Sequence, residues 1–147
     1  MLPDGTSMLI PSELDVCVVD PDPVLYNTLA PLFQSARARL RRFSTAEDLL
    51  AGQGPCDVSC VVARALLPGI SGIELIERLR RAGCSAPVVL VVPPDDVDTA
   101  VAAMRSGALD VLETPPPISR LLHTLMASRN GGQTSRRAAA PLDANGA

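Results

Sequence analysis

Short apolar runs of strand length recur along the chain and alternate with segments in which apolar residues are spaced as on a helix. Most of the runs are apolar throughout, which is typical of strands that are buried on both faces. The expected strands are Asp15–Val19, Ala38–Phe43, Val58–Ala63, Pro87–Val92 and Ala108–Leu112.

The second of these runs differs because it carries charge. Arg37, Arg39 and Arg41 alternate along it and are expected on one side of the strand. Charged side chains on an edge strand resist unwanted pairing with other chains, so this run is expected at an edge of the sheet.

Five helices are expected between and after the strands, from apolar spacing, capping residues and terminating glycines. The segments concerned are Pro23–Ala36, Ser44–Leu50, Ser71–Gly83, Asp95–Gly107 and Ile118–Met126. In the first, Pro31 predicts a kink or a displaced helix start because proline lacks an N–H donor. In the second, Ser44 and Glu47 have the spacing of a capping box. In the fourth, Val97, Ala100, Val101 and Met104 share one side.

Strands that alternate with helices through short connections predict an α/β fold with a mostly parallel sheet and helices on both faces. The expected organisation is a flexible N-terminus over residues 1–12, one domain over residues 13–128 and a disordered tail over residues 129–147. The tail is expected because no apolar periodicity continues after residue 129.

Length and composition exclude several classes of function for this chain. The 147 residues suffice for one ordinary domain, and 47% of them are apolar, with a mean hydropathy of +0.24. A net charge of −3 and an aromatic content of 2% give no basis for direct nucleic-acid binding. No apolar run is long enough to span a membrane and no secretion signal is recognisable, so a cytoplasmic protein without membrane contact is expected.

Three motifs together resemble a known family. The first is the acidic turn Asp20–Asp22 after the first strand, and the second is Leu67–Gly72, which is similar to the family pattern M-P-x-x-x-G. The third is Met104–Asp110, which is similar to A-x-x-x-G-A-x-D-[FY]. Their order and spacing resemble the receiver domain of bacterial two-component response regulators. That resemblance implies a flavodoxin-like fold with five parallel strands in the order 2-1-3-4-5, flanked by five helices.

The resemblance also implies a chemistry. Receiver domains accept a phosphoryl group from a histidine kinase on an aspartate at the end of the third strand. They hold Mg²⁺ with that aspartate and two acidic residues after the first strand, because Mg²⁺ prefers oxygen ligands. A hydroxyl after the fourth strand and a lysine after the fifth contact the phosphoryl oxygens.

Carried over residue by residue, the pattern departs from the family at most of these positions. Asp20 matches the first acidic position, Pro21 stands at the second, and Asp22 follows. The other three positions, for the acceptor, the hydroxyl and the lysine, are occupied by Arg64, Val92 and Thr114. A guanidinium cannot accept the phosphoryl group and repels Mg²⁺. The resemblance therefore implies a degenerate receiver with no catalytic residue, no metal and no cofactor, which is not an enzyme.

A positive role for Arg64 follows from its neighbours. The first and third strands are adjacent in the implied order, so Arg64 is expected to form an ion pair with Asp20 where the metal would otherwise lie, and Asp22 can contribute. The alternative is that Arg64 extends into solvent and contacts neither carboxylate.

The function expected is that of a phosphorylation-independent signalling module that binds a protein: a second copy, an output domain or a sensor kinase. Control of transcription would act through that partner. The expected interaction face lies on the fourth helix, the fifth strand and the last helix. Its residues are Val101, Met104, Arg105, Asp110, Leu122 and Met126. Two alternatives stay open: a phosphoacceptor that uses Asp20 or Asp22 with Mg²⁺, and a small-molecule sensor at the altered pocket.

The remaining chemistry-bearing residues favour structural roles. Cys17 and Cys60 fall on adjacent strands, which leaves a redox pair open, although buried packing is favoured. The Asp95–Asp98 cluster is expected to cap a helix and His123 to lie at the surface.

Overall fold

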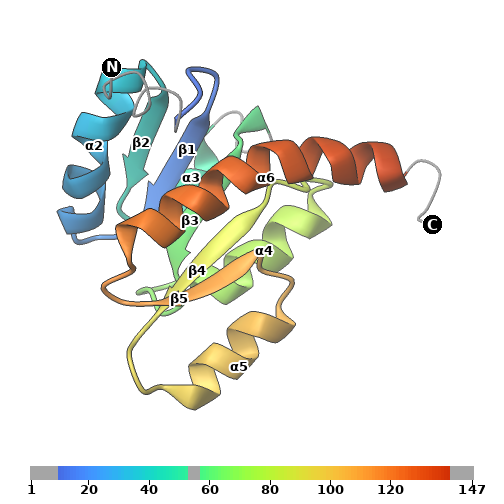
Figure 1. The fold of residues 1–147 in the computed structure, drawn as a ribbon. Helices are drawn as coiled ribbons and strands as arrows, with labels where there is room; N and C mark the ends of the chain where they lie inside the picture. The colour runs from blue at the N-terminus through green and yellow to red at the C-terminus, as the bar shows by residue number, and fades with distance from the viewer. Residues whose placement is uncertain (1–9, 53–56, 140–147) are drawn as a thin grey trace.

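The structure, a computed structural model, describes residues 10–52 and 57–139, the part from residue 129 onward by its backbone alone. Five parallel strands form one sheet in the order β2-β1-β3-β4-β5 (Figure 1). The strands are β1 (Asp15–Val19), β2 (Arg39–Phe43), β3 (Cys60–Arg64), β4 (Val88–Val92) and β5 (Asp110–Glu113). The predicted flavodoxin-like order is confirmed.

Helices cover both faces of this sheet, as predicted. Helices α2 and α6 lie on one face, and α3, α4 and α5 lie on the other (Figure 1). The helices are α2 (Val24–Ala36), α3 (Ala46–Ala51), α4 (Gly72–Arg81), α5 (Val97–Arg105) and α6 (Ile118–Ala139).

The two apolar cores follow from the alternation of side chains along the strands. In β1, Val16 and Val18 belong to the core under α2 and α6, whereas Cys17 and Val19 belong to the core on the opposite face. All five residues of β4 are buried. A strand in the interior of a sheet covered on both faces needs apolar residues at every position, which explains the uninterrupted apolar run.

The charged strand β2 lies at the edge of the sheet that the described residues form and pairs there with β1, as expected. Arg41 forms an ion pair with Asp15 of β1, with an Nη2–Oδ1 distance of 3.4 Å. Arg37 lies outside the strand. It ends α2 in the left-handed conformation, with a φ of 60°.

Two details of the helices differ from the prediction. Of the two outcomes predicted for Pro31, the displaced helix start is wrong, because α2 begins at Val24 and contains Pro31, while the kink stays a prediction. The N-cap of α3 is Thr45 and not Ser44, because the Thr45 side chain accepts a hydrogen bond from Asp48 N. Ser71 and Asp96 cap α4 and α5 as predicted.

Parts of the expected flexible N-terminus and of the expected tail have defined structure. Ile10 is buried in the core under α2 and α6, so the packed domain begins before residue 13. Helix α6 continues to Ala139, through part of the segment that was expected to be a disordered tail. Gly131 and Gly132 disfavour a helix by about 1 kcal/mol each, but such preferences are weak and the alanines near its end favour one. Residues 1–9 and 140–147 lie outside the described part.

No helix within residues 10–52 and 57–139 has both the length and the apolar character that crossing a membrane requires.

Candidate functional site

The carboxyl ends of β1 and β3 bring Asp20 and Arg64 together. Val19 and Ala63 are paired across the two strands, and the two charged residues follow them directly. Arg64 Nε lies 3.0 Å from Asp20 Oδ1. The predicted ion pair between these residues is therefore confirmed.

The two partners are buried to different extents. The side chain of Asp20 is 8% exposed and that of Arg64 is 37% exposed. Arg64 Nε is itself enclosed, yet its N–H has no hydrogen bond of good geometry, so the contact with Asp20 is one of charge rather than a directional bond.

Backbone and side-chain donors complete the surroundings of Asp20. Its Oδ1 atom accepts a hydrogen bond from Asp22 N at 2.9 Å. Its backbone carbonyl accepts one from Arg42 Nη1 at 3.3 Å, which ties the end of β1 to β2. The buried carboxylate is thus compensated by one cation and one amide.

Asp22 has a different role from the one considered for it. It is exposed, and its Oδ1 atom accepts a hydrogen bond from Val24 N at 3.0 Å at the start of α2. Within the described residues, Arg64 forms an ion pair with Asp20 but none with Asp22. Pro21 is exposed beside it.

A cavity of about 260 Å³ lies beside the ion pair, between the strand ends and the first turns of α2 and α6. It combines three charged side chains and two threonines with an apolar wall. The lining residues are Asp20, Asp22, Val24, Leu25, Thr28, Arg64, Val91, Thr114, Pro115, Pro116 and Ile118.

Of the sequence-predicted pocket residues, this cavity brings together Asp20, Asp22, Arg64 and Thr114, but not Pro21 or Val92. Val91 lines this cavity, whereas Val92 belongs to the core on the α3–α5 side of the sheet and lines a separate cavity of about 10 Å³ with Arg64 and Thr114. Successive residues of a strand face opposite sides, so a shift of one position exchanges the two faces.

The end of β5 is fixed by its neighbour. Thr114 N donates a hydrogen bond to Val92 O at 2.9 Å, and the Thr114–Pro115 peptide bond is cis. The hydrogen bond holds the half-buried Thr114 beside β4, where it lines the cavity.

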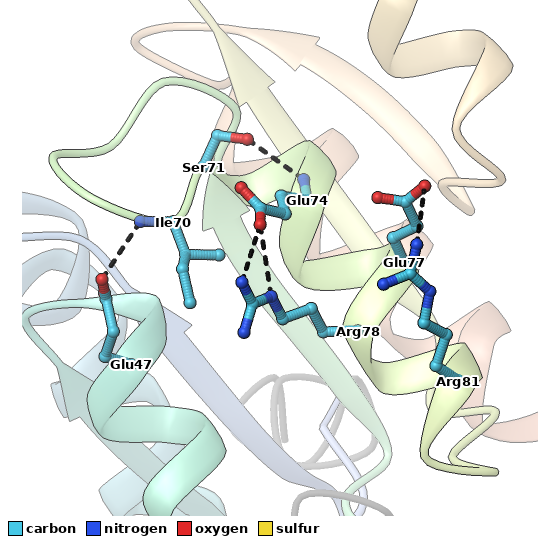
Figure 2. Close-up of polar contacts among 7 residues, drawn as sticks. All are labelled: Glu47, Ile70, Ser71, Glu74, Glu77, Arg78 and Arg81. Atoms are coloured by element: carbon cyan, nitrogen blue, oxygen red, sulfur yellow. Dashed lines mark hydrogen bonds and ion pairs between the residues drawn. The ribbon is translucent and has the colours of Figure 1, made fainter.

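The loop after β3 is held by a side chain from α3. Figure 2 shows Glu47 reaching toward this loop, where its Oε2 atom accepts a hydrogen bond from Ile70 N at 3.1 Å. The same figure shows Ser71 capping Glu74 N and Glu74 paired with Arg78. Glu47 therefore fastens the loop rather than completing the capping box expected with Ser44.

Of the four apolar residues expected on one side of α5, Val97, Val101 and Met104 are exposed, whereas Ala100 packs against the core. Val97 is 68% exposed and Met104 is 66% exposed, whereas the buried residue of this helix is Ala103. Together with Val101 and Leu109 they are among the exposed large apolar residues of the described chain.

The other residues of the expected interaction face differ in exposure and in their contacts within the domain. Arg105 is exposed, and Leu122 and Met126 are partly buried on α6. Asp110 is engaged inside the domain: Arg120 Nη2 lies 3.1 Å from its Oδ1 atom, and Thr124 Oγ1 donates to its Oδ2 atom at 3.0 Å. Asp110 thus ties β5 to α6.

The remaining candidates have the structural roles that were favoured. Cys17 and Cys60 point to opposite faces of the sheet, so the redox pair is excluded. Burial raises the pKa of the Cys17 thiol and raises that of Cys60 to about 12. His123 is exposed. Asp96 accepts hydrogen bonds from Thr99 N and Thr99 Oγ1, which lower the pKa of its carboxyl group.

Within the described part of the chain, no group of three or more histidine, cysteine or acidic side chains is placed to hold a metal ion.

Sequence reasoning missed the apolar wall of the cavity. Val24, Leu25 and Thr28 fall within the expected helix Pro23–Ala36 and Ile118 begins the last one, but none of them was expected at the site. A signal was present, because the starts of α2 and α6 follow the strand ends within a few residues. The first turn of a helix in that position lies beside the carboxyl edge of the sheet.

Comparison with known proteins shows which family the chain belongs to. Residues 16–126 match the family described as the response regulator receiver domain. The chain belongs to that family. This receiver domain is 34% identical over 119 residues to the transcriptional regulatory protein FixJ of Azorhizobium caulinodans, which covers 81% of the chain and 56% of FixJ. It is 30% identical to nodulation protein W of Bradyrhizobium diazoefficiens, over 84% of the chain and 54% of that protein.

Solved structures agree with this assignment. The response regulator StyR superposes with a TM-score of 0.74 at 29% identity, over 89% of this chain and 66% of StyR. The structure named FixJ-N gives a TM-score of 0.69 at 26% identity, over 80% of this chain and 94% of that one. The receiver domain spans about half the length of the curated relatives FixJ and nodulation protein W.

Proposed function

We propose that this receiver domain signals without accepting a phosphoryl group, as a protein-interaction module whose state is set by its partner or by a ligand. The observation that carries the proposal is the ion pair between Arg64 and Asp20 at the ends of β3 and β1. Relatives such as FixJ are named as transcriptional regulators, so control of transcription through a partner is part of the proposal.

The proposal rests on where Arg64 stands. It is the last residue of β3, at the position that corresponds to the phosphoacceptor in the family pattern. A guanidinium is positively charged at every accessible pH and has no oxygen to which a phosphoryl group could be attached.

The same contacts argue against a bound Mg²⁺. The ion needs several oxygen ligands, but Asp20 is neutralised by Arg64 and accepts the Asp22 amide. The Asp22 carboxylate caps the first turn of α2. A divalent cation would have to displace these donors and lie against a permanent positive charge.

Incubation with Mg²⁺ and acetyl phosphate tests this proposal directly. We expect the intact mass of the protein to remain unchanged, while a receiver with an acceptor aspartate gains one phosphoryl group under the same conditions. Arg64→Asp is the informative variant, because it places a carboxylate at the end of β3. Phosphorylation of the unmodified protein would overturn the proposal.

The alternative hypothesis, that Asp22 is phosphorylated, has one observation in its favour. Asp22 is exposed, whereas Asp20 is nearly enclosed. If the mass increases, loss of the increase in Asp22→Asn would assign the phosphoryl group to Asp22.

For the contact surface we propose the exposed side of α5 with β5 and α6. Val101 and Met104 are more than one-third exposed, and Arg105 adds a positive charge beside them. Leu122 and Met126 continue the surface on α6. Asp110 of β5 binds Arg120 and Thr124 of α6 and so holds β5 and α6 together.

Met104→Glu tests this surface. Because Met104 is 66% exposed, the variant is expected to fold with a free energy of unfolding within about 0.5 kcal/mol of the original. It is expected to lose self-association or binding to the output domain in sedimentation equilibrium, whereas Arg81→Glu on α4 is expected to retain it. Unchanged association of Met104→Glu would contradict the assignment of this surface.

A further inference from the structure

We propose that the cavity beside Arg64 binds a small organic carboxylate with an apolar body. The proposal rests on the function proposed above, because a ligand is needed to set the state of the domain only where no phosphoryl group does so. It names the class of ligand that would set the state of the domain in place of phosphorylation.

The charged end of the proposed site is the Arg64 guanidinium. Its Nε atom lies 3.0 Å from Asp20 Oδ1, while the side chain as a whole remains 37% exposed. The enclosed Nε has no hydrogen-bond partner of good geometry, so the exposed part of the side chain lies toward the terminal nitrogens. Two neighbouring N–H groups of a guanidinium match the two oxygens of a carboxylate, so the terminal nitrogens are suited to this group.

The two aspartates at the cavity do not prevent an anion from binding. Asp20 is paired with Arg64 and hydrogen-bonded to Asp22 N. Asp22 is directed to the amide of Val24 at the start of α2. In addition, α2 and α6 begin with Val24 and Ile118, which both line the cavity, and the first turn of a helix favours negative charge.

The apolar wall decides between an organic anion and a simple inorganic one. Val24, Leu25, Val91 and Ile118 line the cavity together with Pro115 and Pro116. Inorganic phosphate would leave this wall in contact with water, whereas a compact hydrocarbon group would cover it. At about 260 Å³ the cavity lies near the small end of ligand sites, so the ligand is a small molecule.

The probe we choose is benzoate, which has one carboxylate and a compact apolar ring. Benzamide is the matched neutral control, and inorganic phosphate is the matched anion without an apolar body. Each is titrated into the full chain and followed by amide chemical shifts in NMR spectra. Benzoate is expected to shift the signals of Leu25, Thr28 and Ile118 with a dissociation constant on the order of 1 mM. Benzamide and phosphate are each expected to bind at least about 10-fold more weakly.

Two variants at equivalent helix positions locate the site. Val24 and Val97 are the exposed first residues of α2 and α5, but only Val24 lines the cavity. A glutamate is compatible with the first turn of a helix, so both variants are expected to fold. Val24→Glu is expected to weaken benzoate binding about 10-fold or more through charge repulsion, and Val97→Glu is expected to leave it unchanged.

The proposal is overturned if benzamide binds as tightly as benzoate, if phosphate does so, or if Val24→Glu binds benzoate as the original protein does. These outcomes are independent of the acetyl phosphate experiment. A phosphoryl group found on Asp22 would defeat the proposed function, while benzoate binding would still be measured on the unmodified protein.

Discussion

Arg64 and Asp20 form an ion pair in which the anion is far more buried than the cation, with 8% of the Asp20 side chain exposed against 37% of that of Arg64. This asymmetry means that the two partners are not equivalent. Without Arg64, a carboxylate is left enclosed with a single amide donor, whereas without Asp20 the guanidinium can still be hydrated.

Arg64→Met is therefore expected to lower the free energy of unfolding by about 1–3 kcal/mol, because it leaves the buried Asp20 charge without a cation. This range is below that of a fully buried pair, since Arg64 is partly hydrated. Asp20→Asn, which retains an oxygen to accept the Asp22 amide, is expected to cost less. Urea denaturation of each variant measures the difference.

Arg81→Met is the control for that comparison. Arg81 is 75% exposed and its Nη2 atom lies 3.8 Å from Glu77 Oε2, so its loss is expected to change stability by less than about 0.5 kcal/mol. Equal costs for Arg64→Met and Arg81→Met would show that the pair with Asp20 contributes no more than a surface contact.

Gly72→Ala is expected to destabilise the domain, because a Cβ atom at this position would overlap the backbone carbonyl of Arg64. Backbone cannot move aside as a flexible side chain does, so the cost is expected to be about 1–3 kcal/mol or more. Gly52→Ala is the matched control, since its Cβ would meet atoms at ordinary contact distances of 3.4 Å and beyond. Urea denaturation of both variants tests this, and equal stabilities would contradict it.

Much of the fold could be predicted because the strands and helices carry unambiguous apolar patterns. The fully apolar run of β4 indicated an interior strand, and the arginines of β2 indicated an edge. The pair of Arg64 and Asp20 was also within reach of sequence reasoning. Both residues end strands that a parallel sheet of this order places side by side.

The parts that sequence reasoning did not reach depend on contacts between distant segments. Glu47 has the spacing for a capping box with Ser44. Its carboxylate instead accepts a hydrogen bond from the amide of Ile70, 23 residues further along the chain. The cavity faces Val91 instead of Val92, and which of two adjacent valines faces a given helix layer is decided by tertiary packing.

The buried thiols are expected to resist alkylation in the folded protein. Burial raises the pKa of Cys60 to about 12, so near pH 8 its thiolate fraction is roughly 10³-fold lower than that of a free cysteine. Cys17 and Cys84 are buried as well. Iodoacetamide labelling followed by peptide mass spectrometry is expected to show modification of these three residues only after unfolding in urea. Rapid labelling of Cys60 in the folded state would contradict the burial seen here.

The N-cap of α5 is expected to make stability depend on pH in a defined direction. Hydrogen bonds from Thr99 Oγ1 and Thr99 N lower the pKa of Asp96 below its value in the unfolded chain. A group whose pKa is lower in the folded state stabilises the protein above its unfolded pKa, and this contribution is lost as the pH falls toward the folded pKa. The free energy of unfolding of the original protein is therefore expected to exceed that of Asp96→Asn by a constant amount near neutral pH and by less below about pH 4.

Thr99→Val removes the hydroxyl donor that contributes most to the lowered pKa of Asp96, so the stability of this variant is expected to vary less over the same pH range. Urea denaturation across these pH values measures all three proteins, and parallel curves for the original protein and Asp96→Asn down to acid pH would show that the carboxylate gives α5 no more than a neutral cap does.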